Sequence, residues 1–226
     1  MTVTTGRTID ADGQPVPGTG FQVTPGSDLA GLLAERTGPL NSHPTQPVWG
    51  APLDSPDGET IRSLSILGPG YDGPPEHYHE QSVERFDVRA GEPTFHLDGE
   101  SYRAGPGETV TVETGQRHTF SVEGDELSYM MTDIHTPGRL RHILPTLGGL
   151  AHDDGMDADN LLQQVMVARR LAGNTVFTEP DPRVGRPLSR ALAPLARLRG
   201  YQGAYETYRQ PAFWEAHVEQ PELEGR

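Results

Sequence analysis

The sequence contains neither cysteine nor lysine, and both absences narrow what the protein can be. Without cysteine, disulfide bonds and thiolate metal sites are excluded, so any metal must bind imidazole nitrogen or carboxylate oxygen. All 18 basic residues are arginine, against 32 acidic residues, and the net charge is −14. This acidic balance disfavours nucleic acid and anionic membrane surfaces as partners. The missing lysine fits a high-salt cytoplasm and a GC-rich genome equally.

Long apolar runs are missing too. No stretch approaches the roughly 20 apolar residues that a membrane-spanning helix needs, and the opening MTVTTGRTID lacks the basic and apolar parts of a secretory signal. We therefore expect a cytoplasmic protein. Hydrophobic residues make up only 34% of the chain, whereas it has 27 glycines and 21 prolines. That composition is typical of a protein with short strands and many turns.

Changes in residue composition and in hydrophobic periodicity divide the chain into three predicted parts. Residues 1–60 are rich in Gly, Pro, Thr and Asp, and form an N-terminal arm with a short helix that covers the following part. Residues 61–137 alternate apolar and polar residues in short runs separated by glycine-containing turns, which indicates an antiparallel β-sandwich or barrel. Within them, Asp98 and Gly99 form a strong hairpin signal. Residues 138–226 change to a helical period and form a C-terminal helical extension.

Helix signals are confined to the two outer parts. In the arm, Ser27 can cap a short helix that has its leucines on one side. In the extension, Asp157 or Asp159 can cap a helix that Gly173 closes. A second helix is predicted to begin at Pro187, with a kink or break further along because a second proline interrupts it. The apolar side of that second helix consists of Leu188, Ala191 or Leu192, Leu195 and Leu198.

The segment 183–209 is a basic island, with six arginines and one acid, Glu206. Two interpretations remain open. The arginines can form a site for an anion or an acidic partner chain. Alternatively, the segment is an amphipathic helix packed on the barrel, with its arginines paired to barrel carboxylates.

Side chains able to bind a metal fall on inward-facing strand positions. His77 and His79 are two residues apart, so on a strand they point to the same face. Glu84 and His118 each share a parity with apolar residues of their own runs, which places both on the inward side. A buried carboxylate is costly unless it is paired or binds a metal. Three neutral imidazoles and one carboxylate suit a divalent first-row metal, with one or two coordination positions left open.

The spacing of these residues belongs to a longer pattern with two halves. The first half consists of His77-x-His79, Glu84 and Gly91, and the second of Gly107, Gly115 and His118. This pattern resembles the two motifs of the cupin superfamily. The resemblance implies a mostly β protein, with a cupin-type antiparallel β-barrel (double-stranded β-helix or jelly roll) and C-terminal α-helices beside it. It also implies that His77, His79, Glu84 and His118 bind one divalent metal per chain: iron, manganese or nickel, with zinc an alternative.

The sequence departs from the superfamily motifs at three positions, none of them a ligand. Tyr71 stands where the opening glycine is expected, Glu113 replaces a proline, and Val122 replaces the final asparagine. These departures affect the expected loop geometry rather than the ligand set.

A looser resemblance concerns function. The run HYHEQSVERFDVRAGEPTFHLDG, with the later TPGRL, is similar to small single-barrel, quercetin-dioxygenase-like cupins. This likeness implies an oxidoreductase that acts on a small aromatic or enolic substrate with dioxygen, in which Glu84 is both ligand and catalytic proton acceptor. Two other classes remain open: a metal-dependent isomerase or lyase for a small oxo-acid or sugar, and a non-catalytic small-molecule-binding cupin. We also expect a homodimer, because small barrels of this kind commonly bury a sheet face against a second copy.

Overall fold

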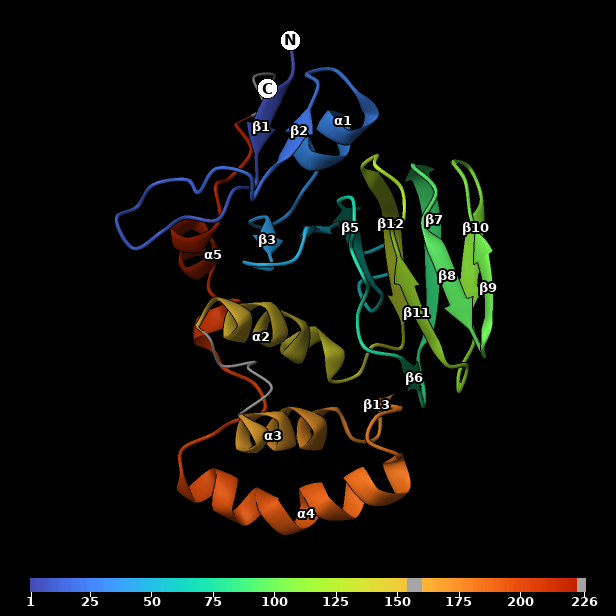
Figure 1. The fold of residues 1–226 in the computed structure, drawn as a ribbon, viewed down its shortest axis with the longest axis vertical. Coiled ribbons are helices and arrows are strands. Elements are labelled where there is room, and N and C mark those ends of the chain that lie inside the picture. The colour runs from blue at the N-terminus through green and yellow to red at the C-terminus, as the bar shows by residue number, and fades with distance from the viewer. Residues whose placement is uncertain (154–159, 223–226) are drawn as a thin grey trace.

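The computed structural model describes residues 1–153 and 160–222, and its strands form two main antiparallel sheets with helices to one side (Figure 1). The six-stranded sheet has the order β10 (Thr109–Val112), β7 (Val83–Ala90), β12 (Ser128–His135), β5 (Ile61–Leu67), β4 (Val48–Leu53) and β3 (Asn41–Ser42). The five-stranded sheet has the order β13 (Thr175–Phe177), β6 (His77–His79), β11 (His118–Ser121), β8 (Thr94–Leu97) and β9 (Glu100–Arg103). The predicted jelly-roll architecture with C-terminal helices is confirmed.

The two sheets enclose a shared apolar core. Phe86 and Met130 from the six-stranded sheet and Phe95 from the other are at most 1% exposed and belong to one cluster. Hydrogen-bonded pairing does not run continuously around this core among the described residues, so the jelly roll is two facing sheets rather than a closed barrel. The hairpin signal is confirmed: Asp98 and Gly99 both have positive φ and join β8 to β9.

The N-terminal arm packs outside the six-stranded sheet. Strands β1 (Val3–Thr5) and β2 (Phe21–Val23) form a small sheet beside α1 (Asp28–Ala34). Helix α1 starts as predicted, because the Ser27 hydroxyl accepts a hydrogen bond from the Ala30 amide at 3.2 Å. The arm also contributes β3 and β4 to the six-stranded sheet, which the period-two pattern did not reveal.

The helical extension differs in detail from its prediction. Its helices are α2 (Leu140–His152), α3 (Leu161–Leu171), α4 (Pro182–Leu198) and α5 (Pro211–His217), with a short 3-10 turn, η1 (Thr207–Arg209). Helix α2 was not predicted. Helix α3 is capped by Asn160, whose side chain accepts from the Gln163 amide at 3.2 Å, whereas Asp157 and Asp159 lie outside the described residues.

Helix α4 begins earlier than predicted and is not broken. Asp181 caps it, and Pro182 occupies its first turn, where a missing amide hydrogen costs little. It then continues through Pro187 and Pro194. Both internal prolines are exposed, so water can satisfy the carbonyls that they leave unpaired.

The packing of α4 also corrects the sequence analysis. Helix α4 packs mainly against α3 rather than on the barrel, although its Arg186 pairs with Glu80 of the barrel segment, as predicted for the arginines of this region. Its buried residues are the small Ser189, Ala193 and Ala196, which allow the two helices to approach closely. The predicted apolar side faces outward instead, with Leu198 85% exposed and Leu195 44% exposed. No helix of the described residues is both long and apolar enough to cross a membrane.

Candidate metal centre

Three neighbouring strands bring the four predicted ligands together at one end of the jelly roll. Strand β6 carries His77 and His79, and β11 begins at His118, which pairs directly with His77. Glu84 is the second residue of β7, in the opposite sheet. One ligand atom from each side chain lies within 4.8 Å of the other three. The convergence expected from strand parity is therefore present, and this group could hold a metal ion.

Burial within the group is uneven. His79, Glu84 and His118 are 2%, 7% and 1% exposed, whereas His77 is only half-buried. The side of the group near His77 is consequently the one open to approach from outside. Phe177 of β13 borders that side, with its ring centroid 6.2 Å from that of His77.

Hydrogen bonds at Nδ1 fix the tautomer of two of the histidines. The His77 Nδ1 atom lies 2.9 Å from the Pro75 carbonyl oxygen, and the His118 Nδ1 atom lies 3.2 Å from the Gln116 carbonyl oxygen. A carbonyl oxygen can only accept, so each Nδ1 carries the hydrogen. The Nε2 atom of each neutral ring therefore presents a lone pair, which is the form that binds a metal.

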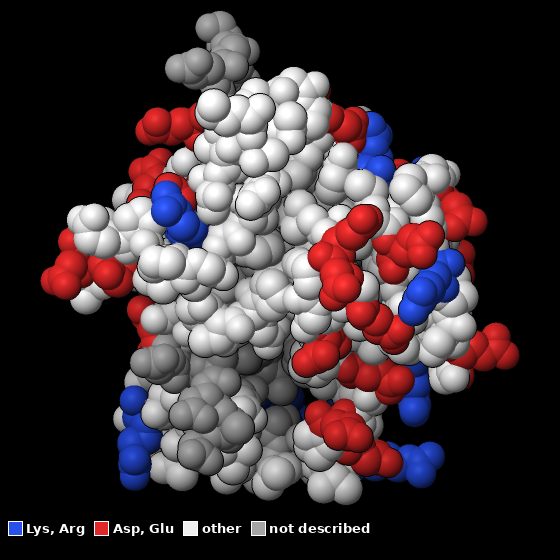
Figure 2. All heavy atoms as spheres, turned by 45° about the horizontal axis from the view of Figure 1, so that its top comes forward, with Lys and Arg blue, Asp and Glu red and all other residues white. Residues whose placement is uncertain are grey.

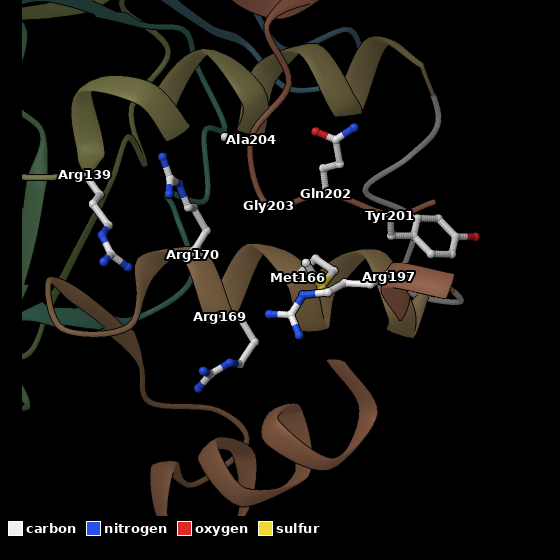
Figure 3. Close-up of a pocket in the computed structure, with 9 residues that line it drawn as sticks. All are labelled: Arg139, Met166, Arg169, Arg170, Arg197, Tyr201, Gln202, Gly203 and Ala204. Carbon is white, nitrogen blue, oxygen red and sulfur yellow. The ribbon is translucent and has the colours of Figure 1, made fainter. Parts of the chain in front are cut away.

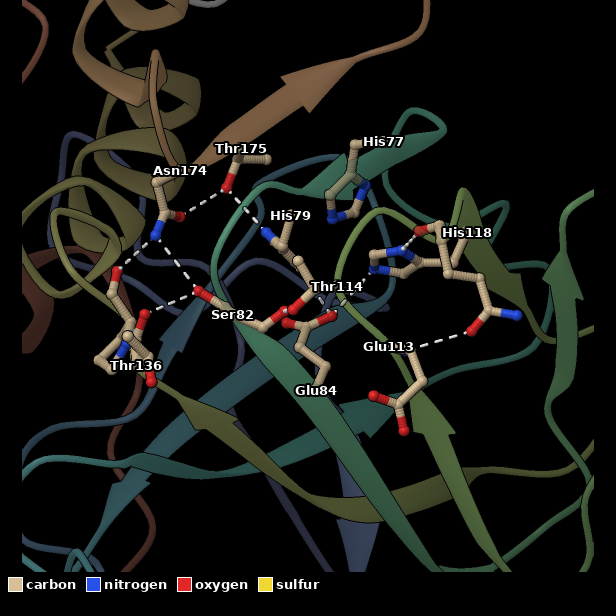
Figure 4. A network of polar contacts seen from close by, with 12 residues as sticks. His77, His79, Ser82, Glu84, Glu113, Thr114, His118, Thr136, Asn174 and Thr175 are labelled. Carbon is tan, nitrogen blue, oxygen red and sulfur yellow. Dashed lines mark hydrogen bonds and ion pairs between the residues drawn. The ribbon is translucent and has the colours of Figure 1, made fainter.

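His79 reaches the same state through a side-chain relay (Figure 4). Its Nδ1 atom lies 2.9 Å from the Thr175 hydroxyl, and that hydroxyl donates to the Asn174 side-chain oxygen at 2.9 Å. Because the hydroxyl hydrogen is used in that second bond, Thr175 accepts the hydrogen of Nδ1. The His79 Nε2 atom then carries a lone pair as well.

The space between these nitrogens and Glu84 has the chemistry of a cation site. Glu84 Oε2 lies 2.9 Å from His118 Nε2 and 3.3 Å from His79 Nε2. The His79 Nε2 atom is buried and has no hydrogen-bond partner among the residues that the structure describes. With the tautomers above, two lone pairs face a carboxylate, an arrangement that repels itself unless a positive charge lies between them. A divalent metal satisfies all of these atoms, so the donor set fits the implied ion.

The protonation states of His77 and Glu84 also favour metal binding. Burial lowers the pKa of His77 to about 4, with a further contribution from His118, so the ring is neutral at pH 7. Burial opposes ionisation of Glu84, but the hydrogen bonds and positive charge that His118 and His79 offer when protonated outweigh it and lower the pKa of this carboxyl below its ordinary value; a metal ion between them would supply that positive charge instead. His77 and Glu84 are therefore in the protonation states that bind a metal.

The residues that support His79 were not predicted. Strand β13 pairs with β6 and places Thr175 opposite His79, although the two are 96 positions apart. Asn174, only 4% exposed, donates to the Ser82 hydroxyl at 3.2 Å and to the Pro137 carbonyl at 3.1 Å. Only the short β-prone run from Asn174 to Phe177, just after Gly173, hints at this strand in the sequence.

The relay leads to a first prediction. Replacing Thr175 with Val keeps the side-chain shape but removes the acceptor for His79 Nδ1. Loss of such an outer hydrogen bond weakens metal binding by about 10- to 100-fold. Competition with a chromophoric chelator would measure this change. Thr175→Ser, which retains the hydroxyl, is the matched control and should bind the metal nearly as the parent does. Equal affinity in Thr175→Val and the parent would show that the relay does not matter.

The candidate ligands lie in a segment that matches a known protein family. The Cupin_2 cupin domain model matches residues 63–135. No curated protein matches the chain. Among solved structures, a predicted oxalate decarboxylase of Thermotoga maritima is 23% identical, covers 39% of this chain and 79% of its own, and has a TM-score of 0.37.

Two further structures match a similar share of the chain. The Cupin_2 domain of an XRE family transcriptional regulator from Enterobacter cloacae is 22% identical, with a TM-score of 0.36, and the match covers 41% of this chain and 99% of that one. A cupin-superfamily sugar phosphate isomerase from Silicibacter pomeroyi is also 22% identical, with a TM-score of 0.34 and coverage of 39% and 60%. The family match agrees with the motif resemblance: residues 63–135 are a Cupin_2 domain, and this domain contains all four candidate ligands.

Proposed function

We propose that this protein is a metal-dependent oxidoreductase of the dioxygenase type, acting on a small aromatic or enolic substrate. The observation that carries the metal-dependent part is the buried, unpartnered His79 Nε2, which faces Glu84 together with His118. His77, His79, Glu84 and His118 would hold one divalent ion of iron, manganese or nickel. When bound, that ion would supply a Lewis acid and a one-electron redox centre.

Electrostatics favour an anionic or ionisable substrate. A divalent ion with one carboxylate and three neutral imidazoles retains a net charge of about +1, which attracts an enolate or a catecholate. The half-buried His77 marks the open side, so the substrate would approach there. The Phe177 ring beside His77 offers a flat apolar surface for an aromatic or enolic substrate.

In this proposal Glu84 acts as the proton acceptor. Its carboxyl stays ionised despite its burial. Because it lies among the metal ligands, it would be near the hydroxyl of a substrate approaching from the His77 side. It would accept the proton that a phenol or enol releases as the anion forms.

The test is oxygen consumption by protein loaded with iron, manganese or nickel, measured against catechols, flavonols and enolisable diketones. We expect turnover with at least one class, and loss of that turnover when zinc replaces the redox-active metal. In Glu84→Gln the rate per bound metal should fall by about 100-fold or more, since an amide cannot accept the proton. Metal content measured on the same samples separates this effect from a loss of the ion.

Other outcomes would change the assignment. Turnover that survives in the zinc form would exclude redox chemistry and favour a metal-dependent isomerase or lyase. Metal binding without turnover of any of these substrates would remove the support for a dioxygenase and favour a binding role.

A further inference from the structure

Four arginines of the helical extension surround a cavity that is separate from the metal centre. Arg139, Arg169, Arg170 and Arg197 line it, together with the segment 201–204, and its volume is about 630 Å³ (Figure 3). The arginines come from the start of α2 and the last turns of α3 and α4. Of the basic island predicted from sequence, only Arg197 lies here; the other three arginines come from outside it.

These four arginines are gathered around one space without carboxylates to balance them among the described residues. Elsewhere in that part of the chain, seven arginines form ion pairs with Asp or Glu, including Arg62 with Asp133 and Arg186 with Glu80. None of the four cavity arginines pairs with a carboxylate of the described residues. Figure 2 shows acidic side chains crowded over the jelly-roll side of the molecule, so carboxylates are plentiful elsewhere. Four like charges around one space repel each other unless an anion occupies it.

The wall opposite α3 is held by buried polar contacts. Gln163 of α3, 1% exposed, donates to the Gln202 carbonyl at 2.8 Å and accepts from the Tyr205 hydroxyl at 2.7 Å. The Tyr205 amide in turn donates to the Thr146 hydroxyl of α2 at 3.0 Å. These bonds tie the segment 201–205 to two helices, so the cavity keeps its shape without a ligand.

A glycine sets the width of the cavity on this side. A Cβ atom on Gly203 would collide with the Met166 carbonyl oxygen and lie 2.5 Å from Arg170 Cβ. Only a residue without a side chain lets the segment lie this close to α3. The backbone of Gly203 and the side chain of Arg170 therefore lie next to each other in the cavity wall.

Arg170 itself supplies an unsatisfied donor. Its Nε atom is buried and has no hydrogen-bond partner within the described ranges 1–153 and 160–222. A buried donor left unpaired costs about 1–3 kcal/mol, and more when it belongs to a charged group. An oxyanion that the Arg170 side chain turned to meet would satisfy this donor and neutralise the neighbouring guanidinium groups at the same time.

We propose that this cavity binds a small multivalent oxyanion, a molecule bearing phosphate or several carboxylates. Guanidinium groups present planar pairs of N–H donors that match the oxygens of both groups. A volume of about 630 Å³ holds a compact ligand of that kind. The site goes beyond the proposed oxidoreductase activity and does not depend on it, because no metal ligand lines the cavity.

Calorimetric titration of the full-length chain with pyrophosphate and with citrate, at constant ionic strength, tests the proposal. We expect at least one of them to bind at the cavity, and the stronger of the two identifies the source of the oxyanion. Arg170→Gln and, separately, Arg197→Gln should each weaken binding by about 10-fold or more, because each removes a charged donor. Arg190→Gln, an exposed position of α4 outside the cavity, is the matched control and should leave the affinity unchanged.

Two results would overturn the site. The first is no binding of either anion at millimolar concentration. The second is equal affinity in the parent and both cavity variants, which would mean an adventitious ion only. Two separate variants, each checked by its thermal melting curve, keep the test decisive if one of them fails to fold.

Discussion

Protein with His118 replaced by Ala should lose nearly all of its bound metal while it remains folded. His118 contributes one of four convergent ligand atoms, and its Nε2 is the nitrogen closest to Glu84 among the contacts of that carboxylate. Losing an outer hydrogen bond already weakens a site by about 10- to 100-fold, so losing a direct ligand should weaken it by more than about 100-fold. Elemental analysis after purification, with chelator competition, measures the change.

The fold should survive because the strand ladder does not depend on the imidazole. Backbone pairing holds β11 between β6 and β8 whatever side chain occupies the position. His96→Ala is the matched control: this histidine lies on β8, bonded to Ser101, outside the ligand group. Full metal occupancy in His118→Ala would refute the ligand assignment. A variant without a cooperative melting transition would show instead that fold and site cannot be separated.

Replacing Gly91 with Ala should destabilise the protein far more than the same change at Gly107, although both glycines belong to the motif pattern. Both have positive φ, where an alanine costs about 1–2 kcal/mol. At Gly91 a Cβ atom would also meet Ser128, whose Cα would lie 2.7 Å away, whereas at Gly107 nothing lies within 4 Å. Overpacking adds about 1–3 kcal/mol.

The expected losses of unfolding free energy are therefore about 2–5 kcal/mol for Gly91→Ala and about 1–2 kcal/mol for Gly107→Ala. Urea denaturation of both variants beside the parent would measure them. Similar losses in the two variants would mean that the Ser128 contact relaxes at little cost, and that backbone conformation alone explains the glycine at position 91.

Sequence reasoning succeeded where one local rule determines the outcome. The period of two along a strand places alternate side chains on one face, so the inward positions of Glu84 and His118 followed from their neighbours. The spacing within the motif then identified His77 and His79 as the other two candidate ligands. The convergence of the four side chains could be predicted without knowing the strand order, because the resemblance to cupins implied that they share one site.

It failed where contacts join distant segments. Helix α4 has an apolar stripe that periodicity assigns to the interior, yet the helix buries its small residues against α3 and leaves Leu195 and Leu198 outside. Amphipathic pattern alone cannot tell which face a neighbouring helix will take. Likewise nothing near Thr175 indicates that its hydroxyl will accept from a histidine of a strand that precedes it by almost a hundred positions.

The pairing of β13 with β6 limits how the metal centre can be transplanted. A hybrid that kept residues 61–137 and exchanged everything after them would inherit all four candidate ligands. It would nevertheless lose Thr175 and Asn174, and His79 could then present either nitrogen to the interior. The smallest exchangeable unit of this chemistry is therefore larger than the segment that carries the motif. It extends to at least Phe177, and engineering that respects only the family boundary would deliver the ligands without their orientation.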